Sequence, residues 1–155
     1  MRVIYVHGAF ADADSWFGIP EHVENLNADL IPKRVELKHH DKPVQSLNIG
    51  SLNDYVRSIE GKLPDDETEQ CVLVGHSLGG MAISAAAADP ALKGRIKRLV
   101  YVAAVMPMAG QTAGALLPVL SKGQGAVLAE FHKLGLVGAI RAMTTLASRD
   151  MGKSW

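Results

Sequence analysis

The feature that most constrains the fold is the segment CVLVGHSLGG at positions 71–80. It begins with apolar residues that favour a strand and continues through Gly-x-Ser-x-Gly with Ser77 at its centre. It then leads into an alanine-rich run that favours a helix. A strand that turns into a helix through this motif is typical of a nucleophile elbow, the sharp turn that exposes a serine side chain above a sheet. The segment therefore predicts an α/β protein in which Ser77 is the candidate catalytic residue.

Strand-like and helix-like segments alternate along the first two thirds of the chain. The apolar patterns predict strands at 2–6, 30–37, 71–74 and 96–105, and helices at 15–28, 52–63 and 78–88. Such alternation is typical of a parallel sheet with helices on both faces, so we expect an α/β fold with a sheet of about four strands.

Two of these strands carry signs of their place in the sheet. Pro32 indicates that strand 30–37 lies at an edge, because proline has no N–H to donate to a neighbouring strand. Strand 96–105 has no polar alternation after Arg98, which is typical of a strand buried on both faces.

The last third of the chain has a different character. Short apolar segments with helical spacing are separated by glycines and a proline, and no further strand pattern follows. We therefore predict a sheet-containing core at 1–109 and a helical segment at 110–155.

The composition excludes several classes of partner. The 16 basic residues balance the 16 acidic ones, so no net charge favours nucleic acid or an anionic membrane. The longest apolar run, 99–106, is too short to span a bilayer, and no signal peptide is visible. Cys71 is the single cysteine, which fits a reducing compartment, so we expect a cytoplasmic protein. No metal-ligand spacing, dinucleotide motif or Walker loop is present, so we predict no cofactor and no metal.

A serine nucleophile needs a turn that presents it, donors for the oxyanion and a general base. Gly75 and Gly79 allow the elbow to close, with His76 as the residue just before the serine. The backbone amide of Leu78 is then one oxyanion donor. The second donor is expected from the loop at positions 7–10, which follows the strand that would neighbour the elbow strand.

Three blocks of sequence, in this order, resemble the α/β-hydrolase superfamily: residues 5–10 with Trp16 downstream, residues 72–81, and residues 101–107. More narrowly, they are similar to the small esterase and hydroxynitrile-lyase branch that includes plant methyl-salicylate esterases. The resemblance covers residues 2–111. It implies that Ser77 is the nucleophile, that the backbone amides of Ala9 and Leu78 form the oxyanion hole, and that the chain from about residue 110 begins a helical cap.

The resemblance also implies an acid and a histidine after two further strands beyond the cap. This chain ends inside the presumed cap, so it looks C-terminally truncated relative to the family. Met108 stands where relatives often carry an acid. His39 or His40 with Asp41, and separately His132, are the alternative sources of a base, because a triad is recognised by geometry and not by position. The other histidines are expected to be structural or on a helix surface: His7, His76 and His22.

The leading hypothesis is hydrolysis of a small-molecule carboxylic ester through an acyl-enzyme on Ser77. One alternative is a non-catalytic hydrolase-fold protein, either a truncated pseudoenzyme or a small-molecule-binding module. A further alternative is a lyase of the hydroxynitrile type, because one fold supports several reactions.

Without the family's later strands, strand 96–105 would be an apolar edge strand. Exposed apolar edges pair readily with other chains. Three outcomes are open: the C-terminal helices cover this edge, a second copy pairs along it to form a homodimer, or the chain is a fragment of a longer product.

Overall fold

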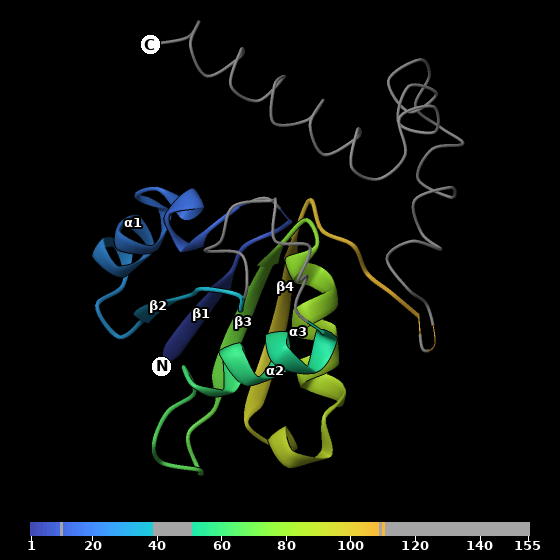
Figure 1. Cartoon of the computed structure of the whole chain (residues 1–155). Helices are drawn as coiled ribbons and strands as arrows, with labels where there is room; N and C mark the ends of the chain where they lie inside the picture. Colours follow the sequence, from blue (N-terminus) through green and yellow to red (C-terminus); the bar gives the residue numbers. More distant parts are fainter. Residues whose placement is uncertain (10, 39–50, 109, 111–155) are drawn as a thin grey trace, which may run out of the picture. The chain divides into compact units, whose positions relative to one another are not determined.

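A computed structural model gives the structure of residues 1–9, 11–38, 51–108 and 110. These residues belong to a compact unit, Met1–Gly110, built on a four-stranded parallel sheet of order β2-β1-β3-β4 (Figure 1). The strands are β1 (Arg2–Val6), β2 (Ile31–Val35), β3 (Cys71–His76) and β4 (Ile96–Val102). The helices are η1 (Ala13–Trp16), α1 (Ile19–Leu26), α2 (Leu52–Glu60), α3 (Gly79–Ala88) and η2 (Pro90–Leu92). The predicted parallel α/β fold is confirmed.

The register of the strands brings their carboxyl ends to one edge of the sheet. Val6 at the end of β1 pairs with Gly75 of β3, and Gly75 pairs with Tyr101 of β4. The residues that follow β1 and β3 therefore emerge side by side, which is where ligand sites form in parallel sheets.

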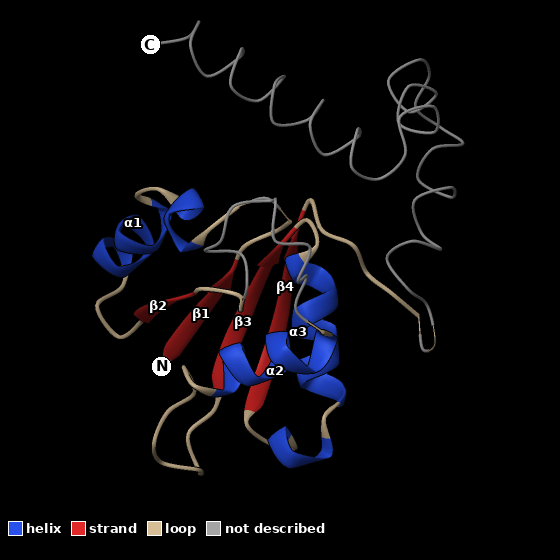
Figure 2. Ribbon diagram, viewed as in Figure 1, coloured by secondary structure: helices blue, strands red, loops and turns tan. Residues whose placement is uncertain are grey.

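Side chains of the central strands alternate between two cores. Ile4 and Val6 of β1 enter a cluster formed with α2 and α3, where Ile59 and Ile83 are fully buried. Val3 and Tyr5 point to the other face and pack with Trp16 of η1. Figure 2 shows α2 and α3 together on one face of the sheet, while α1 packs beside β2. Helices therefore cover both faces, as alternation of strands and helices predicts.

The predicted helix at 15–28 is wrong in one respect: two shorter helices take its place. Phe17 has a φ of +47°, which no residue of an α-helix adopts, and Gly18 then caps the start of α1. The chain therefore turns between η1 and α1 before the helical pattern continues.

The two outer strands of the described sheet test the predictions about edge position and about burial. β2 lies at an edge, as Pro32 predicts. β4 lies at the other edge of the described sheet, and it is not buried on both faces, because none of its 7 residues is fully buried. Its Arg98 is exposed, and Val102 keeps 41% of its surface accessible. The strand ends at Val102, just before Ala103 adopts a φ of +43°.

The predicted helical segment at 110–155 falls outside the described residues, apart from Gly110 itself. The domain boundary between 1–109 and 110–155 therefore stays a prediction. In the part of the chain that the structure describes, no helix has the length and apolar character needed to cross a bilayer.

Candidate active site

Ser77 lies directly after β3 in a strained backbone conformation. Its φ is +53°, in the left-handed region that costs a residue with a side chain roughly 1–2 kcal/mol. The surroundings hold it there from two sides. Its carbonyl oxygen accepts hydrogen bonds from the amides of Gly80, at 3.2 Å, and Val105, at 2.9 Å, and its own amide donates to Val102 at 3.4 Å. A strained serine between a strand and a helix is the geometry of a nucleophile elbow.

Two glycines let the backbone close tightly around this turn. A Cβ at Gly75 would lie 2.8 Å from the carbonyl oxygen of Gly79, which is closer than real Cβ atoms approach. A Cβ at Gly79 would lie 2.5 Å from the carbonyl oxygen of Val6. The elbow therefore packs against the end of β1. Glycine occupies both positions at which a Cβ would clash with neighbouring backbone.

The loop after β1 passes beside the Ser77 side chain. A Cβ at Gly8 would lie 2.7 Å from Ser77 Cβ and 3.2 Å from Ser77 Oγ. Ala9 follows Gly8 and is half-buried, as is Leu78 on the other side of the serine. The structure therefore brings together the segments that carry Ser77, Ala9 and Leu78, although they come from two different strand ends.

His7 is buried, with 1% of its surface exposed, and both of its ring nitrogens face backbone groups. Nδ1 lies 2.8 Å from the carbonyl oxygen of Gly8, which can only accept, so Nδ1 carries the proton. Nε2 accepts a hydrogen bond from the Leu37 amide at 3.1 Å. These bonds fix a neutral tautomer, so the 3.3 Å approach of Glu36 Oε1 to Nε2 is an ion pair only if the ring becomes protonated. His7 therefore links the loop after β1 to the segment after β2 through both of its ring nitrogens.

His76 lies on the side of the sheet that faces Trp16. Its ring is exposed and packs edge to face against Trp16, with ring centroids 6.2 Å apart. Trp16 in turn packs against Tyr5, with ring centroids 5.2 Å apart, and its buried Nε1 has no hydrogen-bond partner among the described residues. The residue before the serine is thus held by aromatic packing with η1.

The described residues do not place a general base at Ser77. His7 is committed to backbone partners, His22 is exposed on α1, and His76 packs against Trp16. Met108 is exposed at the position where relatives often carry an acid. The other candidate residues, His39, His40, Asp41 and His132, lie outside the described residues.

Comparison with known proteins decides the family. The model of the alpha/beta hydrolase family matches residues 3–152. This chain belongs to the α/β-hydrolase family. The predicted assignment is confirmed, and esterases recur among the proteins that the chain resembles.

The relatives of this α/β-hydrolase are longer proteins. A carbendazim-hydrolysing esterase from Nocardioides sp. (strain SG-4G) is 40% identical over 68 residues, which cover 44% of this chain and 27% of that protein. An extracellular α/β-hydrolase from a Paenibacillus species matches with a TM-score of 0.64 and 22% identity, over 86% of this chain and 50% of that one. A pyrethroid hydrolase from Sphingobium faniae JZ-2 matches with a TM-score of 0.60 and 26% identity, over 72% and 43%. The chain spans half or less of the length of these proteins.

Two parts of this α/β-hydrolase site were not predicted from the sequence. Glu36 and Leu37, at the carboxyl end of β2, hold the loop after β1 through Ala13 and His7. Val105 holds the carbonyl of Ser77 from the segment after β4. The sequence offers one signal for these residues, which is their place in the chain. Both segments follow the carboxyl ends of strands, where sites form in parallel sheets.

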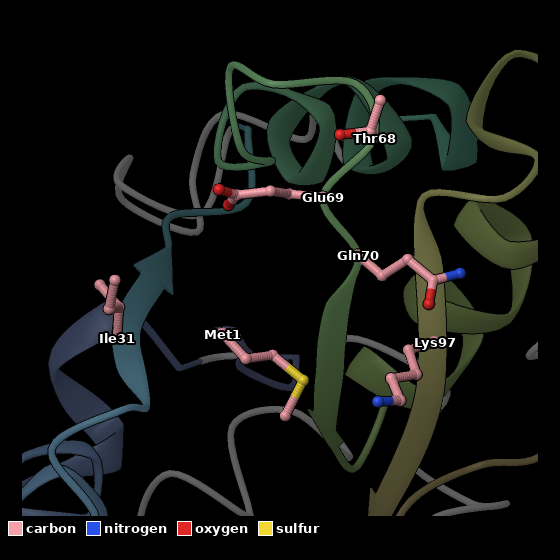
Figure 3. Close-up of a pocket in the computed structure, with 6 residues that line it drawn as sticks. All are labelled: Met1, Ile31, Thr68, Glu69, Gln70 and Lys97. Carbon is pink, nitrogen blue, oxygen red and sulfur yellow. The ribbon is translucent and has the colours of Figure 1, made fainter.

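The pocket in Figure 3 lies away from this site. It is an open hollow of about 400 Å³ at the amino ends of the strands, where Met1 precedes β1 and Gln70 precedes β3 (Figure 3). Its lining residues are Met1, Ile31, Thr68, Glu69, Gln70 and Lys97. Ser77 lies at the opposite, carboxyl end of β3. Among the described residues, no group of three or more His, Cys, Asp or Glu side chains could hold a metal ion.

Proposed function

We propose that this α/β-hydrolase cleaves carboxylic esters of small molecules, with Ser77 as its nucleophile. The observation that carries the proposal is the strained backbone of Ser77, at a φ of +53°, with its Oγ beside the loop after β1. Strain at this half-buried serine is a cost to stability, and strained residues of this kind gather at functional sites. The site offers the serine and the backbone amides from which an acyl-transfer centre is built.

The chemical steps follow from this arrangement. Ser77 Oγ forms a bond to the ester carbonyl carbon while its proton passes to a general base. The backbone amides of Ala9 and Leu78 donate to the oxyanion that develops on the carbonyl oxygen. The carbon–oxygen bond to the alcohol then breaks as the base returns the proton to the leaving oxygen. Water repeats these steps on the acyl-enzyme and releases the acid.

The base is proposed from the sequence alone. Either His39 or His40 with Asp41 follows the β2 region at the carboxyl edge of the sheet, and His132 is the alternative in the C-terminal segment. The substrate class is supported by the relatives, which include a carbendazim-hydrolysing esterase and a pyrethroid hydrolase.

A non-catalytic, ligand-binding protein is the second candidate. It is favoured by one observation: the described histidines face other groups, and none of them is placed to act on Ser77. No observation on the described residues favours the hydroxynitrile-type lyase.

The experiment compares p-nitrophenyl acetate hydrolysis by the chain, by Ser77→Ala and by the control Ser58→Ala. Ser58 is a serine of α2 whose hydroxyl donates to Asp54 O. Ser58→Ala therefore shows how the loss of a serine hydroxyl outside the site changes the rate. We expect turnover by the chain and by the control, and a fall of about 10³-fold or more in kcat for Ser77→Ala. Equal rates in all three proteins would contradict the proposal, and a folded chain without turnover would favour the binding protein.

We also propose that a second copy of the chain pairs along the β4 edge to form a homodimer. Within the described residues this edge has no neighbouring strand, and its end is apolar and exposed at Val102. A cytoplasmic location also stays a proposal, resting on the single Cys71, while the Paenibacillus protein is described as extracellular.

A further inference from the structure

We propose that Glu36 is a positioning residue, which holds the loop between β1 and η1 in the conformation that places the Ala9 amide beside Ser77. The catalytic part of this inference rests on the proposed function of Ser77. The loop itself can be examined independently of activity.

The start of the loop is held by His7. Its buried ring accepts from the Leu37 amide at 3.1 Å and donates to Gly8 O at 2.8 Å. Because Leu37 directly follows Glu36, the end of β2 fixes the point at which the loop leaves β1.

The end of the loop is held by the Glu36 side chain. Its Oε2 accepts a hydrogen bond from the Ala13 amide at 2.8 Å, where η1 begins. Its Oε1 lies 3.3 Å from His7 Nε2, but that nitrogen carries no proton in this tautomer, so the bond to Ala13 is the contact through which the carboxylate holds the loop. A hydrogen bond from an amide to a carboxylate is stronger than one between neutral groups.

This attachment matters because of what the loop touches. A Cβ at Gly8 would lie 3.2 Å from Ser77 Oγ, so a small displacement of the loop moves its backbone relative to the reacting serine. An oxyanion donor acts on charge that develops in the transition state, and a displaced donor therefore lowers kcat more than it raises KM. A purely structural role of Glu36 would not predict that kcat falls more than KM rises.

The variants are Glu36→Ala, Glu36→Gln and a control, Glu21→Ala. Glutamine keeps an oxygen that can accept from Ala13, whereas alanine removes it. Glu21 is an exposed carboxylate paired with Arg34 at 2.7 Å, and it is matched to Glu36 in charge and in having a partner. For Glu36→Ala we expect kcat to fall about 10- to 100-fold with KM changed by less than about threefold. Glu36→Gln should recover most of this loss, and the control should match the unmodified chain.

Amide hydrogen exchange of residues 8–13 supplies the second readout. Glu36→Ala should speed exchange of the Ala13 amide by about tenfold, since one charge-assisted hydrogen bond is removed. Unchanged exchange in Glu36→Ala would overturn the inference, whatever the activity. Faster exchange with an unchanged kcat would overturn it too. If the unmodified chain shows no turnover, the proposed function of Ser77 fails on its own, and exchange alone decides whether Glu36 holds the loop.

Discussion

At the scale of single residues, Ser77 is a position where local preference and the fold disagree. Serine does not favour a φ of +53°, yet hydrogen bonds from Gly80 and Val105 hold its carbonyl in place. The result is a hydroxyl presented at the carboxyl end of β3 instead of one packed into a regular strand. Such conflicts between sequence and structure gather at functional sites.

The strain can be measured by comparing Ser77→Gly with Ser77→Ala. Both variants lack the hydroxyl, but glycine adopts a positive φ without a steric penalty. We expect Ser77→Gly to be the more stable of the two by about 1 kcal/mol, as measured by urea unfolding. Equal stabilities would show that the backbone at Ser77 is not strained.

Gly75 gives a second prediction at this scale. An alanine Cβ there would meet the Gly79 carbonyl oxygen at 2.8 Å, so Gly75→Ala should destabilise the chain by about 1–3 kcal/mol and lower esterase activity. Gly61→Ala is the matched control, because its Cβ would lie 3.7 Å from the nearest atom, Arg57 O, in ordinary contact. We expect this control to be neutral or slightly stabilising. Thermal unfolding of both variants provides the measurement, and similar losses for the two would argue against a tight elbow.

At the scale of secondary-structure elements, the sequence predicted each strand of the described sheet and the helices α2 and α3, with ends displaced by a few residues. The apolar spacing of these segments agrees with their burial, as in β1, whose alternate residues enter opposite cores. The predicted helix 15–28 failed at Phe17, where the pattern says nothing about a positive φ. The support from Glu36 was missed because a side-chain bond between residues distant in sequence leaves no periodic signal.

The N-terminus of α2 makes a prediction about pH. Ser51 caps this helix and shares hydrogen bonds with Asp54, while Lys38 pairs with the same carboxylate at 3.0 Å. The hydrogen bonds from Ser51, followed by the bond from Lys38, lower the pKa of Asp54 to about 2 from its usual 3.8. A lowered pKa in the folded state stabilises the fold above the unfolded value, and this contribution is lost as the pH falls from about 4 to about 2.

The test is the unfolding temperature of the chain and of Asp54→Ala between pH 2 and pH 6. We expect Asp54→Ala to unfold at a lower temperature near pH 6, with the difference shrinking below about pH 4. A constant difference for Asp54→Ala across this range would contradict the assigned role of its charge.

At the scale of the whole molecule, the chain matches the α/β-hydrolase family over residues 3–152, and it spans half or less of the relatives' lengths. The order of the sequence blocks was enough to predict the family, because each block marks one strand end of the sheet. A base was not predictable in the same way, since it is defined by distance from Ser77 and not by position in the chain.

The proposed pairing along β4 is also a property of the whole molecule. We expect sedimentation at increasing concentration to show a shift from monomer towards dimer. Val102→Lys places a charge on the exposed end of this strand and should weaken that shift, since charged residues protect edge strands from pairing. Ile19→Lys, on the exposed side of α1, is the control. A monomer at every concentration would contradict the homodimer.

The central claim is that Ser77 is an activated nucleophile, and covalent labelling tests it most directly. The chain is incubated with a fluorophosphonate, which reacts with activated serine hydroxyls by forming an oxygen–phosphorus bond and releasing fluoride. Intact mass and peptide mapping then count and locate the adducts. We predict a single adduct on Ser77 in the folded chain and in Ser58→Ala, and none in Ser77→Ala. A folded chain that stays unlabelled, or one labelled equally after Ser77→Ala, would contradict the account.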